Sequence, residues 1–258
     1  MSLAHIPVLF VAAALAGMLN SVAGGGSFIS FPALIFTGVL PIPANATSTV
    51  ALWPGSVAAL GAYRKIVPRS PRVLVTLGLT SVVGGVLGAL LLLHTPQATF
   101  MHLVPYLFGI ATLLFTFGKR LTERVRQLIK AGGPPSWSRG RGIMGAMLLQ
   151  LVIAVYGGFF GGGIGILMLA LLEMMRMGNI HAMNGVKSLL AAAINGAAVV
   201  TFIVARAVVW RQATLMIVGA VLGGYGGAHL AQRIPTPLVR GFVIGVGCFM
   251  TFYFLWKY

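Results

Sequence analysis

Long apolar runs alternate with short polar or basic stretches along the whole chain, so lipid must be the solvent for most of its surface. The pattern predicts ten apolar helical segments, five in each half of the chain. A full span of the bilayer needs about 20 residues, and the second, sixth and seventh segments are shorter than that. The expected segments are Ile6–Ala23, Ser27–Val39, Ala44–Tyr63, Val73–Leu93, Phe100–Phe117, Ile143–Tyr156, Ile164–Met175, Ala182–Val204, Ala213–Leu230 and Val239–Trp256.

The two halves repeat one pattern of glycine and polar positions. Gly24-Gly25-Gly26 precedes the second segment, and Gly161-Gly162-Gly163 precedes the seventh. Such a duplication in an apolar chain is typical of transporters built from two related halves. We expect a first repeat in residues 1–118, a basic connector in residues 119–141 and a second repeat in residues 142–258. Four polar positions follow each triple glycine, and their spacing among themselves is identical in the two halves: Asn45, Ser48, Thr49 and Ser56, then Asn184, Lys187, Ser188 and Asn195.

Each triple glycine is expected to separate two short helices that dip into the membrane and return, or two tilted partial spans. Irregular backbone at membrane depth is tolerated only inside protein or beside a wet cavity. Five segments per half is an odd number, so the two repeats should be inverted relative to each other. The predicted fold is an all-α polytopic membrane protein with two inverted repeats and short broken or re-entrant helices at the glycines.

Basic residues predict the orientation. The loop Arg64–Arg72 and the connector Lys119–Arg141 are rich in lysine and arginine, so both should be cytoplasmic. Arg206, Arg211 and Lys257 then fall outside, and both termini face outward. This distribution predicts a multi-pass membrane protein with the connector on the cytoplasmic side.

Composition narrows the possible functions. Hydrophobic residues make up 58% of the chain and charged residues 8%, whereas soluble domains carry about a quarter charged residues. The net charge of +16 does not indicate nucleic-acid binding, because the cations fall in short loops between apolar spans. Cys248 is the single cysteine, so an intrachain disulfide and a cysteine-based metal site are excluded. We expect no metal, no cofactor and no catalytic constellation, and therefore not an enzyme.

The polar positions at i, i+3, i+4 and i+11 share one helical face. Hydrogen bonds between helices are one explanation for such a stripe. Its identical placement in both halves, with Lys187 added to one, favours a shared ligand site between the repeats. Lys187 either extends to the cytoplasmic surface or provides a fixed positive charge, and the chain has only Glu123 and Glu173 as acidic side chains.

The triple glycines predict a place where an anion can bind. Each precedes a short helix, whose N-terminal N–H groups and positive dipole end bind anions without side chains. Close helix packing through small residues is the alternative explanation. Asn20, Ser21 and Ser27 flank the first triple glycine and add hydrogen-bond donors.

These motifs carry a family resemblance. Gly17 to Ser27, Pro32 and Ala44 to Ser48 resemble the TauE/SafE sulfite-exporter family of bacterial membrane transporters. Gly157–Gly163, Asn184 to Ser188 and Asn195-Gly196 are similar to that family's second repeat. The resemblance implies transport of sulfur oxyanions or organosulfonates, such as sulfite or sulfoacetate, across the inner membrane.

We therefore expect export of a small sulfur-containing anion through a central site, by alternating access. An anion channel and an uptake carrier for another small anion remain open. The expected partners are the anion and the lipid bilayer, with a homodimer possible. The predicted site comprises Asn20, Ser21, Gly24, Gly25, Gly26, Ser27, Asn45, Ser48, Thr49, Gly161, Gly162, Gly163, Asn184, Lys187, Ser188 and Asn195.

Overall fold

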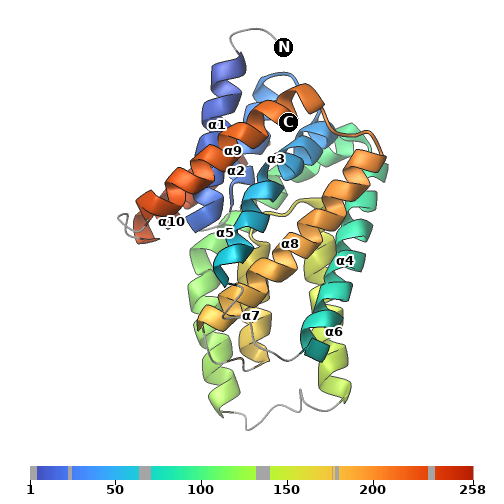
Figure 1. Cartoon of the computed structure of the whole chain (residues 1–258), viewed down its shortest axis with the longest axis vertical. Helices are drawn as coiled ribbons and strands as arrows, with labels where there is room; N and C mark the ends of the chain where they lie inside the picture. The colour runs from blue at the N-terminus through green and yellow to red at the C-terminus, as the bar shows by residue number, and fades with distance from the viewer. Residues whose placement is uncertain are drawn as a thin grey trace.

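The computed structural model describes residues 5–22, 25–63, 71–131, 140–175, 177, 180–231 and 236–257. Within these ranges every regular element is an α-helix, which confirms the all-α prediction (Figure 1). The helices are α1 (His5–Val22), α2 (Ser27–Phe36), α3 (Pro41–Tyr63), α4 (Pro71–His94), α5 (Gln97–Ala131), α6 (Gly140–Phe159), α7 (Ile164–Met174), α8 (Ile180–Val204), α9 (Trp210–Ala231) and α10 (Thr236–Lys257).

Helix lengths match the apolar pattern except at the sixth segment and at the predicted connector. Among the described residues, three stretches are long and apolar enough to cross a bilayer, namely Val73–His94, Gln97–Val125 and Ala182–Val204. α2 and α7 have 10 and 11 residues, as the short second and seventh segments predicted. The sixth segment was predicted too short: α6 has 20 residues, because its helix continues through Gly157 and Gly158, which pack against other helices.

The segment predicted as a connector is partly helical. α5 continues through residues 119–131 and has 35 residues in all. This stretch consists largely of Lys, Arg, Leu, Glu and Gln, which favour helix, and the helix ends just before the sequence Gly-Gly-Pro-Pro.

In both halves, the first helix packs on the fourth helix of the other half. α1 packs on α9, and its counterpart α6 packs on α4. A Cβ at Gly84 would meet the carbonyl oxygen of Leu151, and one at Gly223 would meet the carbonyl oxygen of Ala14. Glycine lets the two backbones approach this closely in both pairs. The two contacts join equivalent positions of the two halves.

α3 and α8, which are counterparts in the two halves, pack on each other. The indole N–H of Trp53 on α3 donates to the carbonyl oxygen of Ala192 on α8, at 3.1 Å. These two residues are also at equivalent positions in the repeated pattern. α3 additionally packs on α9, and α8 packs on α4.

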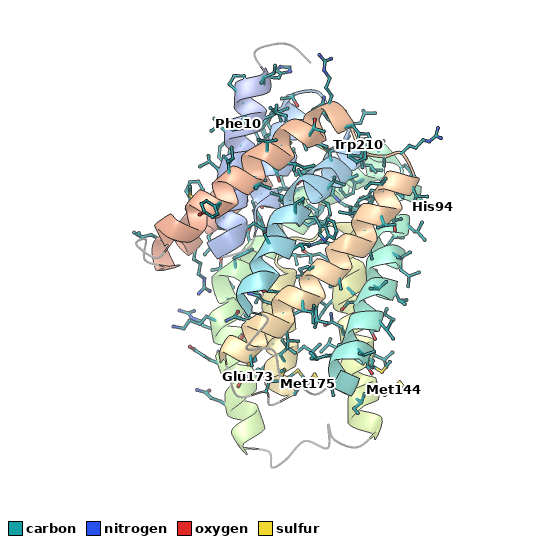
Figure 2. All side chains as sticks on the ribbon, viewed as in Figure 1. Phe10, His94, Met144, Glu173, Met175 and Trp210 are labelled. Carbon is teal, nitrogen blue, oxygen red and sulfur yellow. The ribbon has the colours of Figure 1, made fainter. Side chains whose placement is uncertain are left out.

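The residues labelled in Figure 2 mark two opposite ends of the molecule. Figure 2 shows Phe10, His94 and Trp210 toward the upper end, and Met144 and Glu173 at the lower end. Phe10 lies near the start of α1 and Met144 near the start of its counterpart α6, so these two helices begin at opposite ends.

Mostly buried phenylalanines pack together, and two of them lie on the first half of α5, which follows His94 at the upper end (Figure 2). We call Phe31, Phe100, Phe108, Phe159, Phe160 and Phe254 the aromatic plug. Phe108 is central, with ring centroids 5.4 Å from Phe160, 5.8 Å from Phe254 and 6.0 Å from Phe31. The plug joins α2, α5, α6 and α10 into one apolar cluster.

Candidate functional site

A cavity of about 340 Å³ adjoins the aromatic plug: its lining includes Phe160, and also Phe115, which lies about two turns beyond Phe108 on α5. Residues of α1, α2, α3, α5, α7 and α8 line it, together with the glycine break before α7. Both glycine breaks therefore contribute to one cavity. The predicted site residues among the lining are Asn20, Gly25, Ser27, Thr49, Gly161, Gly163, Asn184, Lys187, Ser188 and Asn195.

Lys187 provides the positive charge of the cavity. It lies about two turns after the start of α8, and its ammonium donates to the Asn184 side-chain oxygen at 3.1 Å. Its aliphatic stem passes Gly165 of α7, where an added Cβ would lie 3.4 Å from Lys187 Cδ. Gly165 therefore leaves space for the lysine stem, and Asn184 orients the ammonium.

The N-terminus of α7 faces the same cavity. Gly161, Gly163, Ile164 and Gly165 all belong to the lining. Gly161 and Gly163 have φ angles of +83° and +77°, in the left-handed region that glycine adopts without strain. The first N–H groups of a helix have no acceptor within the helix, so this end offers donors and a partial positive charge.

The first glycine break contributes a second helix start. Gly25, with φ +88°, and Ser27 line the cavity at the beginning of α2. α2 also packs closely against α1 at this break. A Cβ at Gly26 would lie 2.5 Å from the carbonyl oxygen of Ala16, so only glycine fits there. Near this break, the Asn20 amide donates to the Ser56 hydroxyl at 3.0 Å. Ser56 also lines the cavity.

Four predicted site residues lie in helix packing rather than in the cavity lining. Asn45 is 2% exposed and its amide donates to the carbonyl oxygen of Phe159 at 3.0 Å. Ser48 is 1% exposed and shares a hydrogen bond of 2.6 Å with Ser30. Gly26 packs against α1, and a Cβ at Gly162 would lie 2.9 Å from the Phe160 ring. For Asn45 and Ser48, hydrogen bonding between helices explains the polar side chain.

The remaining two predicted site residues are Ser21 and Gly24. Gly24 and the side chain of Ser21 lie outside the part of the chain that the structure describes.

Apolar residues form much of the remaining wall and were not predicted. Trp53 and Ala191 lie between predicted polar positions on the same faces of α3 and α8, so helical periodicity could have indicated them. α5 and α7 contribute apolar side chains, and no pattern of polar residues in the sequence indicates that these side chains face a cavity. The additional lining residues are Leu52, Trp53, Phe115, Phe160, Ile164, Ile166, Leu169 and Ala191.

The chemistry of the cavity suits an anion. The described lining residues include a lysine, amides, hydroxyls and two helix N-termini, but no carboxylate. Of the two acidic side chains in the chain, Glu123 pairs with Lys119 at 3.9 Å on α5, and Glu173 lies at the lower end of the molecule (Figure 2). A negatively charged ligand would compensate Lys187 without any change in protonation.

Comparison with known proteins identifies the family of the chain. The family model "Sulfite exporter TauE/SafE" matches residues 9–254. The probable membrane transporter protein YfcA of Escherichia coli K12 is 29% identical over 246 residues, covering 95% of this chain and 87% of that protein. A probable membrane transporter protein of Haemophilus influenzae is 25% identical and covers 95% of this chain and 92% of its own length. No solved structure matches the chain. The chain belongs to the TauE/SafE family and is a multi-pass membrane transporter.

Proposed function

We propose that the protein exports a small sulfur-containing anion and that the cavity around Lys187 is its binding site. The observation that carries the proposal is the meeting of both glycine breaks, Lys187 and the amides of Asn184 and Asn195 around one cavity. Anions bind where helix N-termini and a cation converge, because N–H donors and positive charge act together.

The size and walls of the cavity favour an organosulfonate over bare sulfite. Small-molecule pockets begin at about 300 Å³, and this cavity of about 340 Å³ falls at that limit. A sulfite ion displaces roughly two water molecules, or about 60 Å³. Trp53, Phe115 and Leu169 add apolar wall that a carbon-containing substrate can contact. A sulfonate head beside Lys187 and a short organic body beside Trp53 would use both kinds of wall.

Alternating access fits the arrangement better than a channel. The exchanged helix pairs, the equivalent contacts at Gly84 and Gly223, and the opposite starts of α1 and α6 support inverted repeats. In such transporters one repeat rocks against the other around a central site. Packed phenylalanine rings of the aromatic plug adjoin the cavity, and we infer that they close it toward the upper end, whereas a channel needs a continuous path.

The distribution of basic residues supports an inward-facing conformation. The positive-inside rule puts the lower end, where the helical extension of α5 carries Lys119, Arg120 and Arg124, in the cytoplasm. The cavity then lies on the cytoplasmic side of the plug. A negative cytoplasm favours outward movement of negative charge by about 2.3 kcal/mol per charge per 100 mV, so export is the favoured direction.

Transport by purified protein in liposomes tests the proposal. We expect efflux of sulfite and of sulfoacetate that saturates with substrate concentration. Lys187→Ala should abolish it, whereas Lys119→Ala, at a lysine exposed on α5, should not. Equal efflux from wild type and Lys187→Ala liposomes would refute the site. Efflux without saturation would favour a channel.

A further inference from the structure

Lys187 is a charge whose partners in the cavity are neutral. The Asn184 side-chain oxygen accepts from its ammonium at 3.1 Å, and the hydroxyl of Ser188 lies one residue further along α8. The two carboxylate side chains of the chain belong to Glu123 and Glu173, and neither lines the cavity. The N-termini of α2 and α7 add further positive potential, about half a charge each.

Alternating access requires a state in which the cavity is closed to both sides. Closing it around a bound anion places the anion against Lys187, so the charges compensate. Closing it empty leaves the ammonium in a nearly dry space with an amide as its strongest partner. An uncompensated buried charge is strongly unfavourable, even when neutral groups donate or accept hydrogen bonds.

We infer that this carrier changes its facing only when an anion is bound, and is therefore an obligatory anion exchanger. The inference rests on the proposed transport function and specifies its mode. An outgoing anion from the cytoplasm would be followed by an incoming anion from the outside. The return of the empty carrier is expected to be slower than that of the loaded carrier by at least about 100-fold, from the cost of an unpaired buried charge.

Exchange changes what drives export. A swap of two anions of equal charge moves no net charge, so the membrane potential contributes nothing to it. A dianion leaving against an entering monoanion still moves one negative charge outward and keeps the voltage drive. The incoming anion is thus of the same chemical class, small and oxygen-rich, but need not contain sulfur.

Efflux of [14C]sulfoacetate from proteoliposomes tests the inference. The membrane potential is held near zero with potassium and valinomycin, so that charge accumulation cannot limit net efflux. Internal sulfoacetate is released either into buffer with unlabelled sulfoacetate or into buffer whose only anion is polyglutamate, a polymer too large to enter the cavity. We expect rapid efflux with external sulfoacetate and efflux at least about 100-fold slower without it.

Each outcome decides a different point. Equal efflux with and without external sulfoacetate overturns the exchange mechanism but keeps the transport function. Net efflux that a pH gradient drives in the absence of an external anion also overturns the exchange mechanism. In that case the lysine would lose its proton, and the empty carrier could return with a neutral cavity. Absence of efflux under every condition overturns the proposed function on which the inference rests.

Substitutions at Lys187 provide an independent measurement. Lys187→Arg keeps the cation and should keep the dependence on external anion. Lys187→Gln removes the charge, and the small efflux that it retains at raised internal sulfoacetate should no longer depend on external anion. If the Lys187→Gln efflux keeps the wild-type dependence, the lysine is not the cause of coupling. Circular dichroism and size-exclusion profiles matching wild type confirm that both variants are folded.

Discussion

Removing the positive charge of Lys187 should weaken anion binding more than any other single change in the cavity. Two unit charges about 4 Å apart attract by about 4 kcal/mol at an effective dielectric constant of about 20, which suits a half-buried site. Each 1.4 kcal/mol is a tenfold change in Kd, so the full attraction corresponds to about 1000-fold. Lost hydration of both ions offsets part of it.

We therefore expect Lys187→Met to raise the Kd for sulfoacetate by about 100-fold to 1000-fold. Asn184→Ala leaves the ammonium in place but removes its 3.1 Å partner, and should raise the Kd by only about fivefold, the value of one hydrogen bond of about 1 kcal/mol. Isothermal titration calorimetry in detergent micelles measures both constants. A Lys187→Met protein that binds sulfoacetate as tightly as wild type would refute the electrostatic reasoning.

Three further predictions concern the helix breaks, the plug and the orientation. Gly163→Ala and Gly38→Ala both place alanine at positive φ, +77° and +85°, so each should lower stability by about 1 kcal/mol, seen in thermal unfolding. Only Gly163→Ala should also raise the KM for transport, because Gly163 lines the cavity and its added Cβ would lie 3.3 Å from Leu114 Cδ1; a raised KM in Gly38→Ala as well would contradict this. Phe108→Ala removes the central ring of the plug and should cost about 3 to 5 kcal/mol and cause anion leak, whereas Phe249→Ala, 62% exposed, should do neither. In a Cys248→Ser background, a membrane-impermeant maleimide should label Thr95→Cys only from outside and Thr122→Cys only from the cytoplasm; the reverse pattern would invert the orientation.

Spacing in the sequence predicted much of the cavity lining because the polar pattern is duplicated in the two halves. Lys187, Asn184 and Asn195 repeat a pattern of the first half, and a repeated polar pattern in an apolar chain has few structural explanations. The triple glycines were recognisable for the same reason. Positive φ at Gly161 and Gly163 explains why glycine is needed there.

Spacing could not predict that the polar stripe of α3 is divided between helix packing and the cavity lining. A helical face about 100° wide can touch two neighbours at once, and in α3 it does. Asn45 and Ser48 bond to α6 and α2, while Thr49 and Ser56 line the cavity. The apolar wall was also missed, because Phe115 and Leu169 look like ordinary membrane-helix residues until the tertiary packing brings them together.

The position of a bound ligand tests the central claim most directly. A crystal structure with 2-bromoethanesulfonate would locate the bromine by its anomalous scattering and the sulfonate by its density. We predict one site in the cavity, with sulfonate oxygens in hydrogen-bond contact with the Lys187 ammonium and the bromine against Trp53 and Phe115. Bromine density found only outside this cavity, with the space around Lys187 filled by water, would contradict the account.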